Sequence, residues 1–178
     1  MAENKRVDKR LERFQLSHWL MVGGVLLALI FGGWYIFQPR GEQLDFSLSD
    51  IDDGVFHLND FEGSVVLLDF MATWCGACRA SMPELIKLHK EFGEKVVLIT
   101  ISVDPSYDNE DRLRDWKNTW GADWIHARDL ADPPVGQLLG VKAIPTFVLL
   151  DEQGRIAFRH EGLTPETTLE REILTLIH

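Results

Sequence analysis

The sequence predicts a three-layer α/β fold with a mixed central sheet, preceded by one N-terminal transmembrane helix. Two almost continuously apolar segments, 65–71 and 96–103, have the pattern of strands that are covered on both faces. Segments with helical spacing follow each of them, and two further strands, 146–150 and 155–158, flank a glycine-containing turn. Alternating strands and helices that end in an antiparallel hairpin indicate helices packed on both faces of a mixed sheet.

The transmembrane helix is predicted from Trp19 to Phe37, a run of nineteen residues without a charged side chain. A helix of this length crosses the ~30 Å hydrocarbon core of a bilayer, and Trp19, Trp34 and Tyr35 suit its two interfaces. Five basic residues precede the run and only Arg40 follows it closely, which predicts a cytoplasmic N-terminus by the positive-inside rule. The predicted parts are a basic cytoplasmic tail at 1–15, a transmembrane anchor at 16–37, a linker at 38–44 and an extracytoplasmic domain at 45–178.

Two alternatives to an uncleaved anchor fit the residues less well. A cleaved signal peptide has a shorter apolar region and small residues at its cleavage site, whereas this run ends in the bulky segment Trp34–Phe37. A buried helix of a soluble protein is not expected to run for this length without one charged residue. We therefore expect the anchor to be retained, and a mature chain that begins near Gly41 would refute this expectation.

The elements of the domain follow from turn signals and helical spacing. The domain opens with a hairpin whose first strand has the alternation of an edge strand and whose turn is Asp53-Gly54. It closes with a helix that starts at Thr164-Pro165, an N-cap followed by proline in the first turn. The predicted elements are strands at 46–48, 55–58, 65–71, 96–103, near 125, at 146–150 and at 155–158, and helices at 81–92, 110–120, 134–139 and from 165 onward.

Charge is distributed unevenly along the chain, whose formal net charge is −10. Residues 1–37 have a net charge of +2, and the remaining residues have a net charge of −12. An acidic domain repels the phosphates of DNA and RNA, so we expect no nucleic acid as a partner. Solubility is the simplest explanation of the acidity, and we expect a monomer.

The two cysteines of the chain form one motif, Cys75-Gly76-Ala77-Cys78, between the strand at 65–71 and the following helix. A cysteine at the start of a helix lies near unpaired backbone N–H groups and the positive end of the helix dipole, which lower the thiol pKa from about 8.5. The thiolate is the attacking species in thiol–disulfide exchange. We therefore predict that Cys75 is the nucleophile and that Cys78 resolves the mixed disulfide.

Three other uses of this motif fit the sequence less well. Structural zinc usually needs a second pair of ligands, and the chain has no further cysteine. A c-type haem site needs histidine where the chain has Arg79, and two incidental buried cysteines would not explain the position between a strand and a helix. Redox chemistry by the cysteines themselves needs no metal, flavin or nicotinamide, so we expect no cofactor.

The segment Asp69–Cys78, followed by Met82-Pro83, resembles the active-site segment of thioredoxins. Ala143–Thr146 resembles the loop in which that family holds a cis-proline opposite the cysteines. The resemblance covers about residues 44–178 and implies a thioredoxin-like fold. The anchor, the Ala72–Cys75 run and the first hairpin make the chain most similar to the TlpA-like branch. Members of that branch are anchored, extracytoplasmic reductases, several of which serve cytochrome c maturation.

The resemblance also implies substrate-binding residues and partners. Pro145 in the cis form would bring the backbone of Ile144 beside the cysteines, free to pair with an extended substrate segment. Trp74 would flank the disulfide as an apolar platform, and Gly76 and Ala77, between the cysteines, complete the set. The implied partners are extracytoplasmic cysteine-containing proteins and a membrane protein that exchanges electrons with the cysteine pair.

Asp69 is the third candidate catalytic residue. A carboxylate on an otherwise apolar strand is costly to bury in its charged form, so its pKa should rise. Such a group behind Cys78 can accept the proton of the resolving thiol, directly or through a water. Thioredoxins have an acid at this place, whereas TlpA-like proteins more often have asparagine there, a glutamate where this chain has Ser81, and a proline where it has Ala77. These departures weaken the transfer of any one TlpA-like protein's substrate.

Rival functions remain open at this level. Ser102–Pro105 and Trp120–Trp124 resemble stretches of the Sco-type copper proteins, which have three residues between their cysteines and a loop histidine; His126 and His160 are the nearest candidates here. A thiol peroxidase has threonine where this chain has Ala72, and a redox-inactive binding module would not need the intact cysteine pair. The absence of histidine between the cysteines favours a reductant or isomerase over a strong oxidant.

Overall fold

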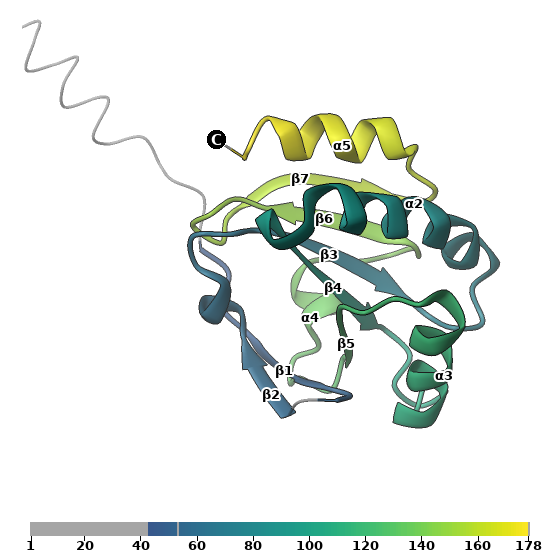
Figure 1. Ribbon diagram of the computed structural model, residues 1–178. Coiled ribbons are helices and arrows are strands. Elements are labelled where there is room, and N and C mark those ends of the chain that lie inside the picture. Colours follow the sequence, from purple (N-terminus) through teal and green to yellow (C-terminus); the bar gives the residue numbers. More distant parts are fainter. Residues whose placement is uncertain (1–42, 53, 178) are drawn as a thin grey trace, which may run out of the picture. The chain divides into compact units, whose positions relative to one another are not determined.

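The computed structural model describes residues 43–52 and 54–177. In that part of the chain, strands and α-helices follow one another in the order expected from the sequence (Figure 1). The strands are β1 (Ser47–Asp50), β2 (Gly54–His57), β3 (Val65–Met71), β4 (Val96–Ser102), β5 (Ile125–Arg128), β6 (Thr146–Leu150) and β7 (Ile156–Glu161). The helices are α2 (Gly76–Phe92), α3 (Glu110–Trp120), α4 (Val135–Leu138) and α5 (Glu166–Leu174), with short 3₁₀ helices η1 (Leu58–Phe61) and η2 (Gly93–Lys95).

The strands form one mixed sheet in the order β2-β1-β5-β4-β3-β6-β7. Strand β3 pairs in parallel with β4 and antiparallel with β6, and β4 pairs in parallel with β5. The two antiparallel hairpins, β1–β2 and β6–β7, form the two ends of the sheet. All of β3 is buried, as expected of a central strand with elements packed on both of its faces.

The sheet separates two apolar clusters, and alternate residues of β3 belong to each. Leu67 and Met71 pack with residues of α2, α3 and α5, whereas Leu68 and Phe70 pack with residues of α4 and the first hairpin. Figure 1 shows α2 and α5 on one side of the sheet. The three-layer arrangement expected from the sequence is therefore present in the described part of the chain.

Several elements differ from the sequence-based expectation. The N-cap of helix α5 is Pro165 rather than Thr164, because the Thr164 hydroxyl donates to the carbonyl of Gly162 instead of capping the helix. Helix α2 begins at Gly76 rather than Ser81, because Cys75 caps the helix and the cysteine motif forms its first turn. Strand β1 is not an edge strand, because it pairs with both β2 and β5; the edge at this end is β2. Strand β7 continues to Glu161 rather than ending at Phe158, because its pairing with β6 extends to Thr146.

The predicted tail at 1–15, the predicted anchor at 16–37 and Asp53 of the first turn lie outside the described residues. Within residues 43–52 and 54–177, no helix is both long and apolar enough to cross a bilayer. At the end of the predicted linker, the backbone N–H of Leu44 donates to the carbonyl of Gly154 at 3.0 Å. Leu44, the last residue of the predicted linker, therefore contacts the domain.

Candidate functional site

Cys75 and Cys78 form a disulfide at the N-terminal end of α2. Cys75 is the N-cap residue of the helix, and its sulfur accepts a hydrogen bond from the backbone N–H of Cys78 at 3.0 Å. Only 6% of Cys75 and 3% of Cys78 is exposed, whereas Gly76 between them is exposed and Ala77 is half-buried. A Cys75 thiolate at this position faces N–H groups of the first helical turn, which is the setting that lowers a thiol pKa.

The loop before β6 lies against Cys75. The Ile144–Pro145 peptide bond is cis, and the carbonyl oxygen of Ile144 lies 3.8 Å from the Cys75 sulfur. The hydroxyl of Thr146 donates to the carbonyl of Ala143 at 2.6 Å and closes the loop around the proline. Two predicted site segments, 69 residues apart in the sequence, therefore meet at the sulfur.

Trp74 projects into solvent beside the disulfide, with 54% of its surface exposed. Its indole N–H donates to the carboxylate of Asp104 at 3.1 Å, a contact that restricts the rotation of the ring. Trp74 lines a groove of about 670 Å³ together with Ala143 and Ile144 of the cis-proline loop. The groove therefore runs between the predicted apolar platform and the predicted substrate-pairing backbone.

Asp69 is buried on β3, with 2% of its surface exposed. It alternates with Leu67 and Met71, which share an apolar cluster with both cysteines, so its carboxyl lies on the α2 side of the sheet. The Thr100 hydroxyl donates to this carboxylate at 3.2 Å and accepts from the indole N–H of Trp124 at 2.9 Å. Burial raises the pKa of Asp69 to about 7, the direction expected from the sequence, and the Thr100 hydrogen bond opposes part of that rise.

A second buried carboxylate near the cysteines, Asp108, has no signal in the sequence. It lies in the loop between β4 and α3 and is fully buried. It accepts hydrogen bonds from the backbone N–H of Thr73 at 3.0 Å, from the Thr73 hydroxyl, and from the Ser102 hydroxyl at 2.6 Å. Asp108 thus ties the residues just before Cys75 to the end of β4. Thr73 is 35 residues away in the sequence, so no local pattern could reveal this contact.

Asp129 supports the far side of the groove in a similar way. Its carboxylate accepts the backbone N–H groups of Val135 and Gly136 at 2.8 and 2.7 Å, at the start of α4. A Cβ atom at Gly136 would lie 3.2 Å from the Asp129 carboxylate, which explains why glycine occupies this close approach. The sequence analysis did not predict these hydrogen bonds of Asp129 either.

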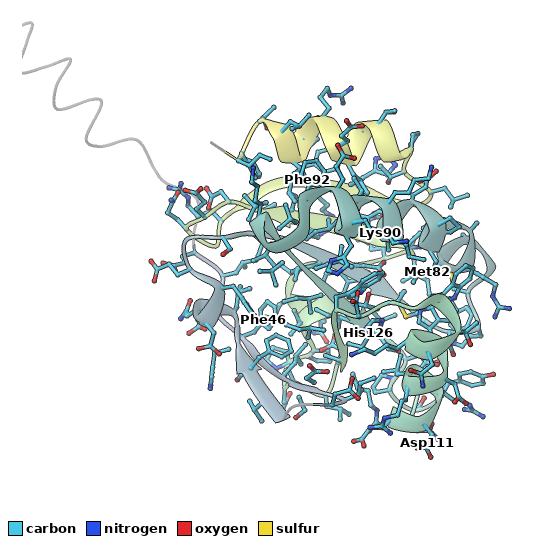
Figure 2. All side chains as sticks on the ribbon, in the orientation of Figure 1. Phe46, Met82, Lys90, Phe92, Asp111 and His126 are labelled. Carbon is cyan, nitrogen blue, oxygen red and sulfur yellow. A yellow bond between two sulfur atoms is a disulfide. The ribbon has the colours of Figure 1, made fainter. Side chains whose placement is uncertain are left out.

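The two histidines of the copper alternative lie far apart in the order of strands. His126 is fully buried on β5 (Figure 2), with Nδ1 2.9 Å from the carbonyl of Trp124, and burial lowers its pKa to about 4. His160 is exposed on β7, the edge strand, and β4, β3 and β6 separate it from β5. In the described ranges, no group of three or more His, Cys, Asp or Glu side chains is placed to hold a metal ion.

The fold, the disulfide at the start of α2 and the cis-proline loop beside it define a thioredoxin-like thiol–disulfide oxidoreductase, whose redox centre is its own cysteine pair. The chain belongs to the AhpC/TSA family, whose model matches residues 40–159. The resemblance to thiol–disulfide oxidoreductases found in the sequence is thereby confirmed.

Individual relatives agree with this classification. The chain is 31% identical over 176 residues to the thioredoxin-like protein YneN of Bacillus subtilis, covering 89% of this chain and 98% of that protein. It is 30% identical over 138 residues to the thiol-disulfide oxidoreductase ResA of Halalkalibacterium halodurans, covering 77% of this chain and 76% of that protein. A solved Chlorobium tepidum structure, assigned as the thiol:disulfide interchange protein DsbE, matches with a TM-score of 0.68 at 30% identity and covers 78% of this chain and 96% of that one.

Proposed function

We propose that the protein reduces disulfides of cysteine-containing proteins outside the cytoplasm and is held at the membrane by an anchor at 16–37. The observation that carries the proposal is the Cys75–Cys78 disulfide at the N-terminus of α2, with the carbonyl of Ile144 3.8 Å from the Cys75 sulfur. The apolar run and the basic residues before it support the anchor and its orientation. The relatives named thiol-disulfide oxidoreductase and thiol:disulfide interchange protein support the exchange reaction.

The reaction transfers two electrons in two exchange steps. The Cys75 thiolate attacks one sulfur of a client disulfide, which forms a mixed disulfide and releases the other client sulfur as a thiolate that solvent protonates. The Cys78 thiolate then attacks the Cys75 sulfur, closes the Cys75–Cys78 disulfide and releases the second client thiolate. The protein is oxidised and the client is reduced.

Asp69 accepts the proton of the Cys78 thiol before the second step. Its burial on the α2 side of the sheet and its pKa of about 7 support this role, because such a carboxyl can both take up and release a proton near neutral pH. Its single hydrogen bond in the described structure, from Thr100, leaves lone pairs free for that proton.

The client segment binds in the groove between Trp74 and the cis-proline loop. The backbone of Ile144 pairs with it by strand addition, with Pro145 holding that backbone in place and Gly76 and Ala77 below the segment. The exposed indole of Trp74 and the 670 Å³ groove support this arrangement.

A protein that reduces disulfides on the outer side of a membrane must receive electrons from the inner side. We therefore propose a membrane electron-transfer protein as the second partner, and cytochrome c maturation as the process served, from the resemblance to the TlpA-like branch. The protein acts as a monomer, and neither nucleic acid nor a bound cofactor takes part.

The reduction potential of the full chain tests the direction of exchange. A value near the ~−270 mV of thioredoxin supports a reductant, and a value near ~−120 mV contradicts it and indicates an oxidant. Orientation is tested separately with intact cells that have been treated with a permeant reductant. A membrane-impermeant maleimide should then modify Cys75, and modification only after lysis would contradict an extracytoplasmic domain.

A further inference from the structure

A second depression adjoins the disulfide on the side of α3. It has a volume of about 330 Å³, and Trp74, Tyr107, Trp116 and Trp120 line it together with two guanidinium groups. Trp74 also lines the groove of the cis-proline loop, so the two hollows share this ring. We name the second hollow the arginine depression, after its two basic residues, Arg79 and Arg112.

Both arginines of the depression are held by aromatic rings rather than by acids. The Cζ atom of Arg79 lies 5.8 Å from the centroid of the Trp116 ring, and that of Arg112 lies 4.2 Å from the centroid of the Tyr107 ring. Each guanidinium donates to one backbone carbonyl, that of Thr73 for Arg79 and that of Tyr107 for Arg112. Since a guanidinium has five N–H donors, most of each fork stays free for a ligand.

The other arginines of the described chain are already satisfied. Arg114, Arg155, Arg159 and Arg171 form ion pairs with neighbouring carboxylates, and Arg128 donates to two backbone carbonyls. Within residues 43–52 and 54–177, Arg79, Arg112 and Arg128 form no ion pair. The guanidinium of Arg128 is satisfied by its two carbonyls, whereas Arg79 and Arg112 both border the depression. Two aromatic-backed guanidinium groups without acidic partners that line the same hollow are suited to carboxylates.

The negative charge of the rest of the domain contrasts with the two arginines of the depression. The chain from residue 38 onward has a net charge of −12, so most of its surface repels an acidic segment. Asp115 also lines the depression, so the two arginines and this aspartate give the depression a net charge of +1. A carboxylate of a partner therefore finds two guanidinium groups beside the disulfide, which would fix the register in which the partner approaches Cys75.

We propose that the arginine depression binds an acidic segment of the client protein, an Asp or Glu within a few residues of the cysteine that Cys75 attacks. The proposal rests on the proposed reductase function and adds a determinant of client choice. Trp74 adjoins Cys75 in the chain and borders the depression, so a client residue near the attacked cysteine lies within reach of both guanidinium groups.

The test compares two short peptides that carry the same disulfide and differ only in Glu against Gln beside the cysteine. The full chain is purified in detergent, reduced with dithiothreitol and freed of reductant, and the second-order rate of peptide reduction is measured. At low salt the Glu peptide should react about fivefold faster, a size set by two solvent-accessible ion pairs. The ratio should fall toward one as salt is raised, because salt screens exposed charges.

Variants locate the effect. The double variant R79Q/R112Q should bring the Glu-to-Gln ratio close to one, whereas R79K/R112K should keep a ratio above one, because lysine retains the charge but not the fork. R171Q removes an arginine that is paired with Glu172 on α5 and serves as the matched control with an unchanged ratio. D115N should increase the ratio, because it removes the acid that competes in the depression.

Each outcome is decisive. Equal rates for the two peptides in the wild-type chain, or a preference that survives in R79Q/R112Q or high salt, would overturn the arginine depression as an acid site. The wild-type salt series decides the matter even where the double variant does not fold. Failure to reduce either peptide would instead overturn the proposed function, so the two failures are distinguishable.

Discussion

Two buried aspartates, Asp69 on β3 and Asp108 in the loop before α3, differ in how their carboxylates are satisfied. Asp108 accepts three hydrogen bonds, from the N–H and hydroxyl of Thr73 and from the hydroxyl of Ser102. Asp69 accepts one among the described residues, from Thr100. A fully bonded carboxylate fixes the groups around it, whereas a carboxylate with one partner keeps lone pairs available for a proton.

This difference separates a structural acid from a chemical one. Asp108 holds the segment just before Cys75, and in the proposed mechanism Asp69 exchanges a proton with the thiol of Cys78. The same substitution, aspartate to asparagine, should therefore have opposite effects on stability at the two positions. The following experiments use that contrast.

Asp69→Asn should make the protein more stable at high pH. The folded state binds the Asp69 proton more tightly than the unfolded state, because the pKa rises from 3.8 to about 7. Below pH ~4 the buried acid therefore leaves the free energy of unfolding unchanged. Between pH ~4 and ~7 it lowers that free energy progressively, and above pH ~7 the loss is constant, on the order of 4 kcal/mol. Urea unfolding should show D69N more stable than wild type at pH 8 and equal to it at pH 4. Equal stability at both pH values would refute the raised pKa.

The same variant should be slow in one step of the exchange. Without the carboxyl, Cys78 loses its proton acceptor, so resolution should slow by roughly a hundredfold, the usual scale of general-base catalysis. Attack by Cys75 should be nearly unchanged, which a stopped-flow burst of mixed disulfide would reveal. An unchanged lifetime of the trapped mixed disulfide would remove Asp69 from the mechanism.

Asp108→Asn should destabilise the domain. An amide in place of the carboxylate offers N–H groups to donors, so at least one buried donor of Thr73 or Ser102 is left unpaired, at a cost of about 2 kcal/mol. Chemical denaturation measures this loss, and D69N at pH 8 is the control of opposite sign. A D108N protein as stable as wild type would mean that the network does not hold the segment before Cys75.

Thr100→Val should produce the smallest change in the exchange reaction. It removes the hydrogen bond that opposes the rise in the Asp69 pKa, so the pKa should move higher by roughly one unit. The pH profile of the resolution step reports that shift, and Thr100→Ser, which keeps the hydroxyl, should match wild type. A profile that does not move in T100V would show that Thr100 does not tune the acid.

Much of the fold could be predicted because its signals are local. The apolar segment of β3, the strand β6 and the helix α3 have the bounds that alternation and helical spacing indicate. The start of α2 could not be predicted by spacing, because its first turn contains Gly76 and depends on the cap at Cys75. The pairing of β1 with its inner neighbour β5 was missed because β5 has little sequence pattern of its own.

In the candidate site, too, the residues that could be predicted are those with a local sequence signal. Cys75, Cys78 and Pro145 lie in short motifs, and Asp69 is conspicuous as a charge on an apolar strand. The bonds of Asp108 and Thr100 join residues far apart in the sequence, and the arginine depression is assembled by packing α3 beside the start of α2. Such contacts exist only once the chain is folded, so no sequence pattern marks them.

The most direct test of the account is the pH at which Cys75 becomes reactive. The reduced full chain is exposed to iodoacetamide over a range of pH, and the modified cysteine is located by mass spectrometry. Modification should occur first at Cys75, with a half-maximal rate well below the ordinary thiol pKa of about 8.5. A half-maximal rate at or above that value, or earlier modification of Cys78, would contradict the assignment of Cys75 as the activated nucleophile.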